Sequence, residues 1–221
     1  MAKEDVTPFE KQDVRGYLHR PDRDSDRGVV LTHGAGGNCD GPLLVALADA
    51  FCEAGMAVLR CDLPFRQRRP KGPPSPATAA ADRAGLRSAI LALSEIAPGP
   101  ILLGGQSYGG RQASMLVADE PDLAAALFLL SYPLHPPGKP AQLRTQHFPR
   151  LSVPAIFVQG TADPFGSIAE LESAITAIPA PHRILPIENA GHDLKRGRFD
   201  LTTIVDALGQ AIEIDGAGAP R

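Results

Sequence analysis

The chain has 221 residues, of which 43% are hydrophobic and 21% charged, and its formal net charge is −3. A chain of this length and composition folds into one globular domain, or two small ones, without needing a disulfide or a metal to hold it together. It lacks the basic surplus that is typical of nucleic-acid-binding proteins, and we therefore expect no nucleic-acid partner.

Several sequence features argue against export and membrane insertion. The longest uncharged apolar run, 123–130, is far shorter than the roughly 20 residues that cross a bilayer. The N-terminal segment is polar and contains acidic residues, unlike the apolar core of a signal peptide. The three cysteines, Cys39, Cys52 and Cys61, contain no C-x-x-C pair and predict buried thiols, not a disulfide framework or a zinc site. We expect a cytoplasmic protein with no membrane partner.

Short apolar runs alternate with amphipathic segments along the chain. The runs are bounded by turn residues, as buried strands are, and cover 28–32, 56–61, 101–105, 124–131, 155–160 and 183–187. The amphipathic segments carry apolar residues on one helical face and predict helices within 44–51, 77–97, 108–118, 168–177 and 201–212. Residues 12–19, before this alternation, predict one or two antiparallel edge strands.

The alternation predicts the fold class α/β, with a mostly parallel, twisted sheet and helices on both faces. We expect a single domain over 1–214 and a disordered tail over 215–221. Two loops rich in proline and arginine, 62–76 and 132–154, each follow a strand and should form walls of a ligand crevice at the carboxyl ends of the strands. The second loop is too short to hold a cap domain.

The strongest chemical signal is the pattern G-x-S-x-G in 105–109, directly between a predicted strand and a predicted helix. In this context the serine occupies a sharp, strained turn, and its hydroxyl projects from the sheet as a nucleophile. The following helix points free N–H groups and its positive dipole end at the serine oxygen. We therefore predict Ser107 as a nucleophile; the alternative is a turn serine with no chemistry.

A glycine-rich segment, 33–37, follows the first predicted parallel strand. When a serine attacks a carbonyl carbon, negative charge develops on the carbonyl oxygen, and backbone N–H donors stabilise it by roughly 3–4 kcal/mol each. Such a loop supplies one donor, and the residue after the nucleophile supplies the other, so we predict the amides of Ala35 and Tyr108 as the oxyanion hole. A phosphate-binding loop is the alternative, although neither common phosphate-loop pattern occurs here.

Two more candidates follow late strands. A carboxylate at Asp163 can orient a histidine, or it can simply cap a helix that starts at Pro164. His192 lies on the loop after 183–187 and is either a catalytic base or a solvated histidine. We predict that Asp163 orients His192, because the side chain of the neighbouring Asp193 should diverge on a tight turn.

Four further residues are candidates for substrate contact. Arg111 lies in the first turn of a helix, where a cation opposes the helix dipole, so it pairs either with an acidic side chain or with a substrate anion. Arg66 belongs to a basic loop, 66–71, that either attracts carboxylate-bearing substrates or is solvated. Tyr132 and His135 end a strand near the expected crevice, where they either shape the pocket or simply pack.

Together these motifs resemble the α/β-hydrolase superfamily over residues 14–212. Ser107, Asp163 and His192 follow that superfamily's order of nucleophile, acid and base, each after a strand. More narrowly, the chain is similar to a group of small, lidless predicted hydrolases related to dienelactone hydrolases and short acyl-esterases. The segments that carry this likeness are THGAGG, CDLPFRQRRPKGPP, GGQSYGGRQAS, YPLHPPGKP, IFVQGTADPFG and GHDL. Dienelactone hydrolases proper use a cysteine nucleophile, so the serine here does not imply their specific reaction.

The motifs and the resemblance imply covalent serine catalysis on a small acyl substrate, an ester or thioester, with no metal or organic cofactor, by a monomer or homodimer. Without a cap, we expect an open, shallow pocket and a preference for acyl groups of about two to four carbons. Two alternatives stay open: a non-catalytic module of this fold that binds a partner protein, and an acyltransferase or peptidase with the same three residues.

Overall fold

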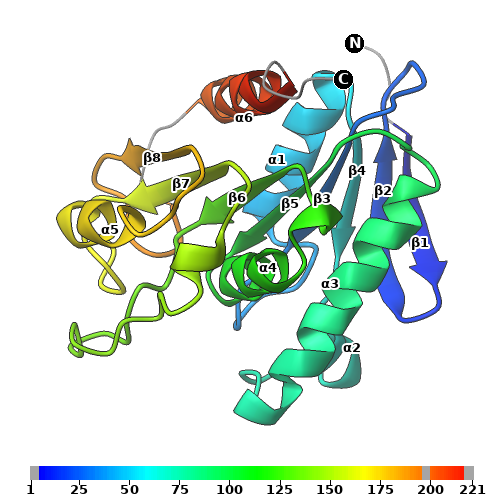
Figure 1. The fold of residues 1–221 in the computed structure, drawn as a ribbon. Helices are drawn as coiled ribbons and strands as arrows, with labels where there is room; N and C mark the ends of the chain where they lie inside the picture. The colour runs from blue at the N-terminus through cyan, green and yellow to red at the C-terminus, as the bar shows by residue number, and fades with distance from the viewer. Residues whose placement is uncertain (1–4, 196–199, 217–221) are drawn as a thin grey trace.

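The computed structural model describes residues 5–195 and 200–216, and its centre is one eight-stranded sheet (Figure 1). The strand order is β1-β2-β4-β3-β5-β6-β7-β8. The first two strands pair antiparallel at one edge, and all pairs from β4 to β8 are parallel. The strands are β1 (Asp5–Lys11), β2 (Val14–Arg20), β3 (Gly28–Thr32), β4 (Ala57–Cys61), β5 (Ile101–Gln106), β6 (Ala126–Leu130), β7 (Ala155–Gly160) and β8 (His182–Ile187).

Helices cover both faces of the sheet (Figure 1). Helices α1 and α6 pack on one face, and α3, α4 and α5 pack on the other. The α-helices are α1 (Pro42–Glu53), α2 (Pro64–Arg68), α3 (Ala79–Ser94), α4 (Tyr108–Asp119), α5 (Ile168–Ile175) and α6 (Leu201–Gly216), and three 3₁₀ turns are η1 (Pro76–Thr78), η2 (Pro121–Leu123) and η3 (Phe148–Arg150).

The continuous apolar runs follow from this two-sided burial. In β3, Val30 points into the core below α3 and α4, whereas Val29 and Leu31 point into the core below α1. Every residue of β3 is buried, as expected for a strand covered on both faces. The α/β fold predicted from the sequence is confirmed.

The strand order reverses between β3 and β5, because the chain runs from β3 outward to β4 and then returns to the other side of β3. In open parallel sheets, ligands bind at such a reversal, outside the carboxyl ends of the strands. The loop after β3 contains the glycine-rich segment, and the turn after β5 contains Ser107. The topology therefore brings two predicted parts of the site together.

Three details refine the predicted organisation. The predicted loop 62–76 contains α2, which starts at Pro64 and buries Phe65. Within the described residues, the connection from β6 to β7 holds only η3, so no cap domain lies there. Helix α6 ends at Gly216, two residues past the predicted end of the domain, and the rest of the predicted tail, 217–221, lies outside the described residues.

In the part of the chain that is described, none of the helices has both the length and the apolar character needed to span a bilayer.

Candidate active site

Ser107 occupies the turn between β5 and α4 in a strained backbone conformation. Its φ of 50° and ψ of −113° lie in a region that residues with a side chain rarely adopt. The close approach of the two arms of the turn explains the glycines on either side. A Cβ on Gly105 would lie 2.6 Å from the carbonyl carbon of Gly109, so only glycine fits there. The G-x-S-x-G pattern thus lets strand and helix meet tightly and leaves the serine hydroxyl at the turn.

The three residues predicted as nucleophile, base and acid form a continuous chain of contacts. His192 Nε2 lies 2.8 Å from Ser107 Oγ. On the other side of the ring, His192 Nδ1 lies 2.8 Å and 3.0 Å from the two carboxylate oxygens of Asp163. These side chains follow three different strands, β5, β7 and β8, whose carboxyl ends share one edge of the sheet.

The carboxylate of Asp163 is buried and held from two further directions. The backbone N–H of Phe165 donates to Oδ1 over 2.8 Å, and the side-chain amide of Gln159 donates to Oδ2 over 3.0 Å. The ring of Phe165 also stacks on the imidazole of His192, with centroids 4.0 Å apart. Asp193 instead accepts the backbone N–H of Lys195 and lies 3.5 Å from its ammonium group. Asp163, and not Asp193, therefore contacts the imidazole of His192.

The sequence analysis did not predict Gln159 and Phe165, the two residues that hold Asp163 and His192 in place. Gln159 is a polar residue at the end of an apolar strand and is completely buried. A polar residue in such a position needs hydrogen-bond partners, and this was a usable signal. Nothing in the sequence singled out Phe165, because its stacking depends on where the loop after β8 places the ring of His192.

Residues 33–37, which we call the oxyanion loop, lie directly against the turn that holds Ser107. A Cβ added to Gly34 would lie 3.4 Å from the Cβ of Ser107, so the loop passes at contact distance. The amides of Ala35 and Tyr108 have no hydrogen-bond acceptor among the described residues. Both residues line the cavity described below, together with Ser107, and the two N–H groups remain available to a ligand oxygen.

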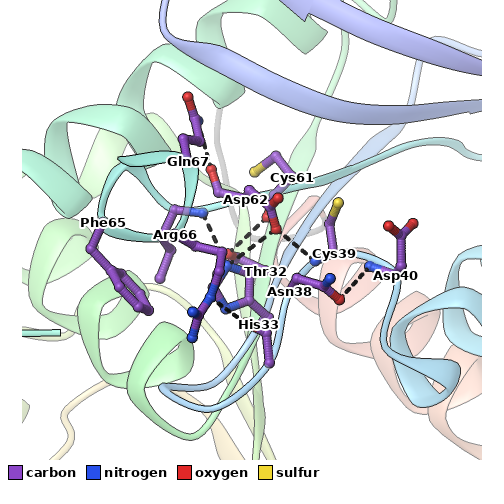
Figure 2. A network of polar contacts seen from close by, with 12 residues as sticks. Thr32, His33, Asn38, Cys39, Asp40, Cys61, Asp62, Phe65, Arg66 and Gln67 are labelled. Atoms are coloured by element: carbon purple, nitrogen blue, oxygen red, sulfur yellow. Dashed lines mark hydrogen bonds and ion pairs between the residues drawn. The ribbon is translucent and has the colours of Figure 1, made fainter. Parts of the chain in front are cut away.

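His33 fastens the start of the oxyanion loop to the loop after β4. Its Nε2 accepts the backbone N–H of Leu63 over 3.1 Å, so its proton is on Nδ1 and is donated to the carbonyl of Gly34 over 2.8 Å. Burial lowers the pKa of His33, and the neutral ring suits both bonds. Asp62 lies 3.4 Å from Nε2 and accepts the backbone N–H of Cys39, which extends the network past the loop (Figure 2).

The structure corrects the prediction that Arg66 contacts substrate. Its side chain is buried, and its guanidinium donates to the carbonyls of Ala35 and Gly37, each over 2.7 Å. Further bonds run to the carbonyls of Arg69 and Gly72. Arg66 faces inward because a short helix, not an open loop, presents it to the oxyanion loop. It therefore acts as a brace for that loop and does not line the cavity.

Asp82 is a buried acid that the sequence analysis missed. Its Oδ1 accepts the backbone N–H of Phe65 over 2.9 Å, and its Oδ2 accepts the hydroxyl of Tyr108 over 2.7 Å. Burial raises the pKa of the Tyr108 phenol, and the contact with the Asp82 carboxylate raises it further. The available signal was position: Asp82 is four residues before Leu86, on the apolar face of the predicted helix. Asp82 anchors the residue whose amide is predicted to hold the oxyanion.

Tyr132 and His135 also lie away from the cavity, contrary to their prediction as substrate contacts. The ring of Tyr132 is fully buried against Phe148 and Phe157, and its hydroxyl donates to the carbonyl of Arg144. His135 is buried too, and its Nδ1 donates to the carbonyl of Pro136. The chain turns inward after β6, so these side chains complete the core beneath the site.

A cavity of about 770 Å³ surrounds Ser107 and His192. Its walls include Pro73–Pro76 from the first predicted wall loop, and Pro133 and Arg144 from the second. Leu43 and Leu44 at the start of α1 add apolar wall that the sequence analysis did not predict. These segments stand around Ser107, and the volume of the cavity is typical of small-molecule sites.

Of the predicted substrate contacts, Arg111 lines this cavity, and its role is considered below. Among the described residues, no cluster of three or more His, Cys, Asp or Glu side chains is placed to hold a metal ion.

A family model described as an alpha/beta hydrolase domain matches residues 25–215. The chain belongs to the alpha/beta hydrolase family. Solved structures resemble the chain over nearly their whole length, and one of them is described as a serine hydrolase without a lid.

Three such structures illustrate the likeness. Dienelactone hydrolase from Anabaena variabilis is 20% identical, with a TM-score of 0.71 over 96% of this chain and 97% of that one. XC6422 from Xanthomonas campestris, described as a serine hydrolase without a lid, is 15% identical, with a TM-score of 0.70 over 100% and 98%. Est1E from Butyrivibrio proteoclasticus is 14% identical, with a TM-score of 0.70 over 96% and 99%. At these identities the likeness establishes the fold of this alpha/beta hydrolase.

Proposed function

We propose that this protein is a serine hydrolase that cleaves small carboxylic esters or thioesters through an acyl-enzyme intermediate. The observation that carries the proposal is the unbroken contact chain from Ser107 through His192 to Asp163 at the wall of a cavity. A turn serine with no chemistry needs neither the histidine nor the buried acid behind it.

In the first half of the reaction, Ser107 Oγ attacks the carbonyl carbon, and its proton passes to His192 Nε2. The carbonyl oxygen becomes an oxyanion and accepts the N–H groups of Ala35 and Tyr108. The bond from carbon to the leaving oxygen or sulfur then breaks, and His192 returns the proton to the leaving group. The alcohol or thiol departs, and the acyl group stays on Ser107.

In the second half, water takes the place of the alcohol. His192 Nε2 removes a proton from the water while its oxygen attacks the acyl carbon. The same two amides hold the new oxyanion, the bond to Ser107 Oγ breaks, and His192 returns the proton to the serine. Asp163 keeps the proton of the neutral imidazole on Nδ1 and stabilises the imidazolium that forms in both halves.

The surroundings of the three residues support this assignment. Pre-set donors at the oxyanion position are worth roughly 3–4 kcal/mol each, and the brace from Arg66 fixes one of the two donor segments. Stacking on Phe165 fixes the plane of the imidazole, so His192 reaches Ser107 and Asp163 from one orientation. Positioning of this kind supplies a large part of enzymatic rate enhancement.

The cavity also bears on substrate size. A volume of about 770 Å³ admits acyl or alcohol groups larger than the two to four carbons expected from the sequence. We therefore propose small to medium esters and thioesters as substrates. Whether activity is highest for acyl groups of two to four carbons, as the sequence predicts, is measured with esters of increasing acyl length. A cytoplasmic location is part of the proposal, because all three cysteines are buried and so suit a reducing compartment. A monomeric or homodimeric state is also proposed, from the sequence alone.

A substrate screen tests the proposal. Purified wild-type protein is assayed with p-nitrophenyl esters of two to twelve carbons and with matched thioesters and anilides. Ester or thioester turnover with release of free acid, together with little anilide cleavage, supports the proposal. Preferred anilide cleavage would assign a peptidase, and transfer of the acyl group to an added amine or alcohol in place of water would assign an acyltransferase. Failure to turn over any compound would overturn the proposal in favour of a non-catalytic module.

A further inference from the structure

Two arginines line the cavity that contains Ser107. Arg111 lies on α4, one helical turn after the nucleophile, and Arg144 lies in the connection between β6 and β7. Both side chains are half-buried. The sequence analysis left Arg111 with two options, an acidic partner or a substrate anion, and did not single out Arg144.

Neither guanidinium has an acidic partner within residues 5–195 and 200–216. Among the described residues, the side chain of Arg111 makes no hydrogen bond or ion pair, and its Nε is buried without an acceptor. The side chain of Arg144 donates, within the described residues, only to the carbonyl of Pro133, over 3.3 Å. Four other arginines do pair with carboxylates: Arg150 lies 2.8 Å from Asp119, and Arg60, Arg87 and Arg15 have partners of the same kind.

The other charged groups at the cavity do not offset the positive charges of Arg111 and Arg144. Lys195 also lines the cavity, but Asp193 lies 3.5 Å from its ammonium group and offsets that charge. Burial, followed by the charge of Arg111, lowers the pKa of the Arg144 guanidinium. Two like charges at the wall of a partly buried cavity are unfavourable without an anion between them.

We propose that Arg111 and Arg144 form a subsite for an anionic group of the substrate, a carboxylate or a phosphate. The inference rests on the proposed ester hydrolysis and names the substrate class: esters that carry a negative charge away from the bond that breaks. The planar fork of a guanidinium matches carboxylate and phosphate oxygens and binds them with charge-assisted hydrogen bonds. An anion in this position neutralises the repulsion between the two arginines.

Matched substrates test the subsite on both sides of the scissile bond. On the alcohol side, 4-acetoxybenzoate and 4-acetoxyphenyl phosphate are compared with the neutral 4-acetoxybenzamide. On the acyl side, ethyl hydrogen glutarate is compared with the ethyl ester of its half-amide. We expect at least one anionic ester to exceed its neutral match in kcat/KM by about tenfold or more, the order of one charge-assisted hydrogen bond. A larger gain for the carboxylate esters would identify a carboxylate site, and a larger gain for the phosphate ester would identify a phosphate site.

Variants assign the preference to the arginines. Arg111→Gln and Arg144→Gln should each bring the ratio of anionic to neutral kcat/KM toward one, whereas Arg150→Gln, which alters an exposed arginine outside the cavity, should keep the wild-type ratio. Ratios within twofold of one for every pair in the wild-type protein would overturn the inference, and this result does not depend on whether the variants fold.

Binding without chemistry separates this inference from the proposed function. Calorimetric titration of the Ser107→Ala variant with ethyl hydrogen glutarate and 4-acetoxyphenyl phosphate should show binding that weakens about tenfold when Arg111→Gln is added. Hydrolysis of neutral esters without such binding overturns the subsite and leaves the hydrolase assignment intact. Arginine-dependent binding by a protein that hydrolyses no ester supports the subsite while overturning the proposed reaction.

Discussion

The contact between β7 and the loop after β8 decides where His192 lies, and Gly160→Ala tests it. A Cβ on Gly160 would lie 2.7 Å from the carbonyl carbon of Ala190 and 2.8 Å from the carbonyl oxygen of Gly191. The carbonyl oxygen of Ala190 would lie closer still, so these atoms must retreat by roughly 0.7 Å or more to reach an ordinary contact of about 3.4 Å. His192 follows Gly191 directly, so the imidazole moves with them.

The displacement has a calculable effect on the reaction. The distance from His192 Nε2 to Ser107 Oγ is 2.8 Å, and a displacement of about 0.7 Å along that line would lengthen it to roughly 3.5 Å, past the usual limit of a hydrogen bond. Misplacement on the scale of 1 Å lowers rates about 10²-fold, so we expect kcat/KM for p-nitrophenyl acetate to fall by about that factor. Overpacking at this position should cost about 1–3 kcal/mol of stability.

Gly191→Ala is the matched control in the same loop. A Cβ at Gly191 meets no atom within 4 Å, and we expect kcat/KM within about threefold of wild type. Thermal unfolding and near-ultraviolet circular dichroism of both variants show whether they are folded. A folded Gly160→Ala protein with wild-type activity, or an equal loss in Gly191→Ala, would refute the reasoning that this contact positions the base.

Three further predictions concern the acid, the brace and a buried histidine. Asp163→Asn should lower kcat about 10⁴-fold by disturbing the imidazole tautomer, while Asp193→Asn keeps kcat within about threefold; the opposite pattern in steady-state assays would reassign the acid. Arg66→Lys should lower kcat about 10- to 100-fold with little change in KM, because the substitution loosens the oxyanion loop and not the substrate pocket. The control Arg68→Lys, at an exposed arginine, should change neither constant. Equal kcat values in the two variants would show that Arg66 does not support the oxyanion loop. Burial, and after it the charges of nearby arginines, lowers the pKa of His147 from 6.5 to about 4. As the pH falls from 7 to 4.5, His147 therefore becomes protonated in the unfolded chain while it stays mostly neutral in the folded one. The free energy of unfolding should fall by about 2–3 kcal/mol over this range. Urea titrations at the two pH values should show a smaller decline in His147→Gln, and an identical decline in both proteins would contradict the assignment.

The central geometry of this site could be predicted because it depends on strand ends. Ser107, Asp163 and His192 each follow an apolar run, and in a parallel sheet all such ends meet at one edge. Local patterns then identify each residue: glycines where strand and helix touch, and short loops after the late strands. The oxyanion loop was found for the same reason, since it follows β3 at the reversal of strand order.

The parts that failed depend on the direction of side chains. Arg66 and Tyr132 lie in segments that do border the site, but their side chains turn inward to backbone carbonyls and to the core. Nothing in the sequence separates a basic residue that faces the cavity from one that supports its wall. Arg144 was missed for the converse reason: it is one of several cations in a long loop, and only the folded connection places it beside Arg111.

Covalent labelling tests the central claim most directly. A fluorophosphonate probe reacts with an activated serine by forming a bond from the serine oxygen to phosphorus with loss of fluoride, and mass spectrometry locates the adduct. We expect one adduct on Ser107 in the wild-type protein, much slower labelling of His192→Ala, and none in a folded Ser107→Ala protein. Labelling of the Ser107→Ala protein at the wild-type rate, or a wild-type adduct on another residue with Ser107 unmodified, would contradict the account.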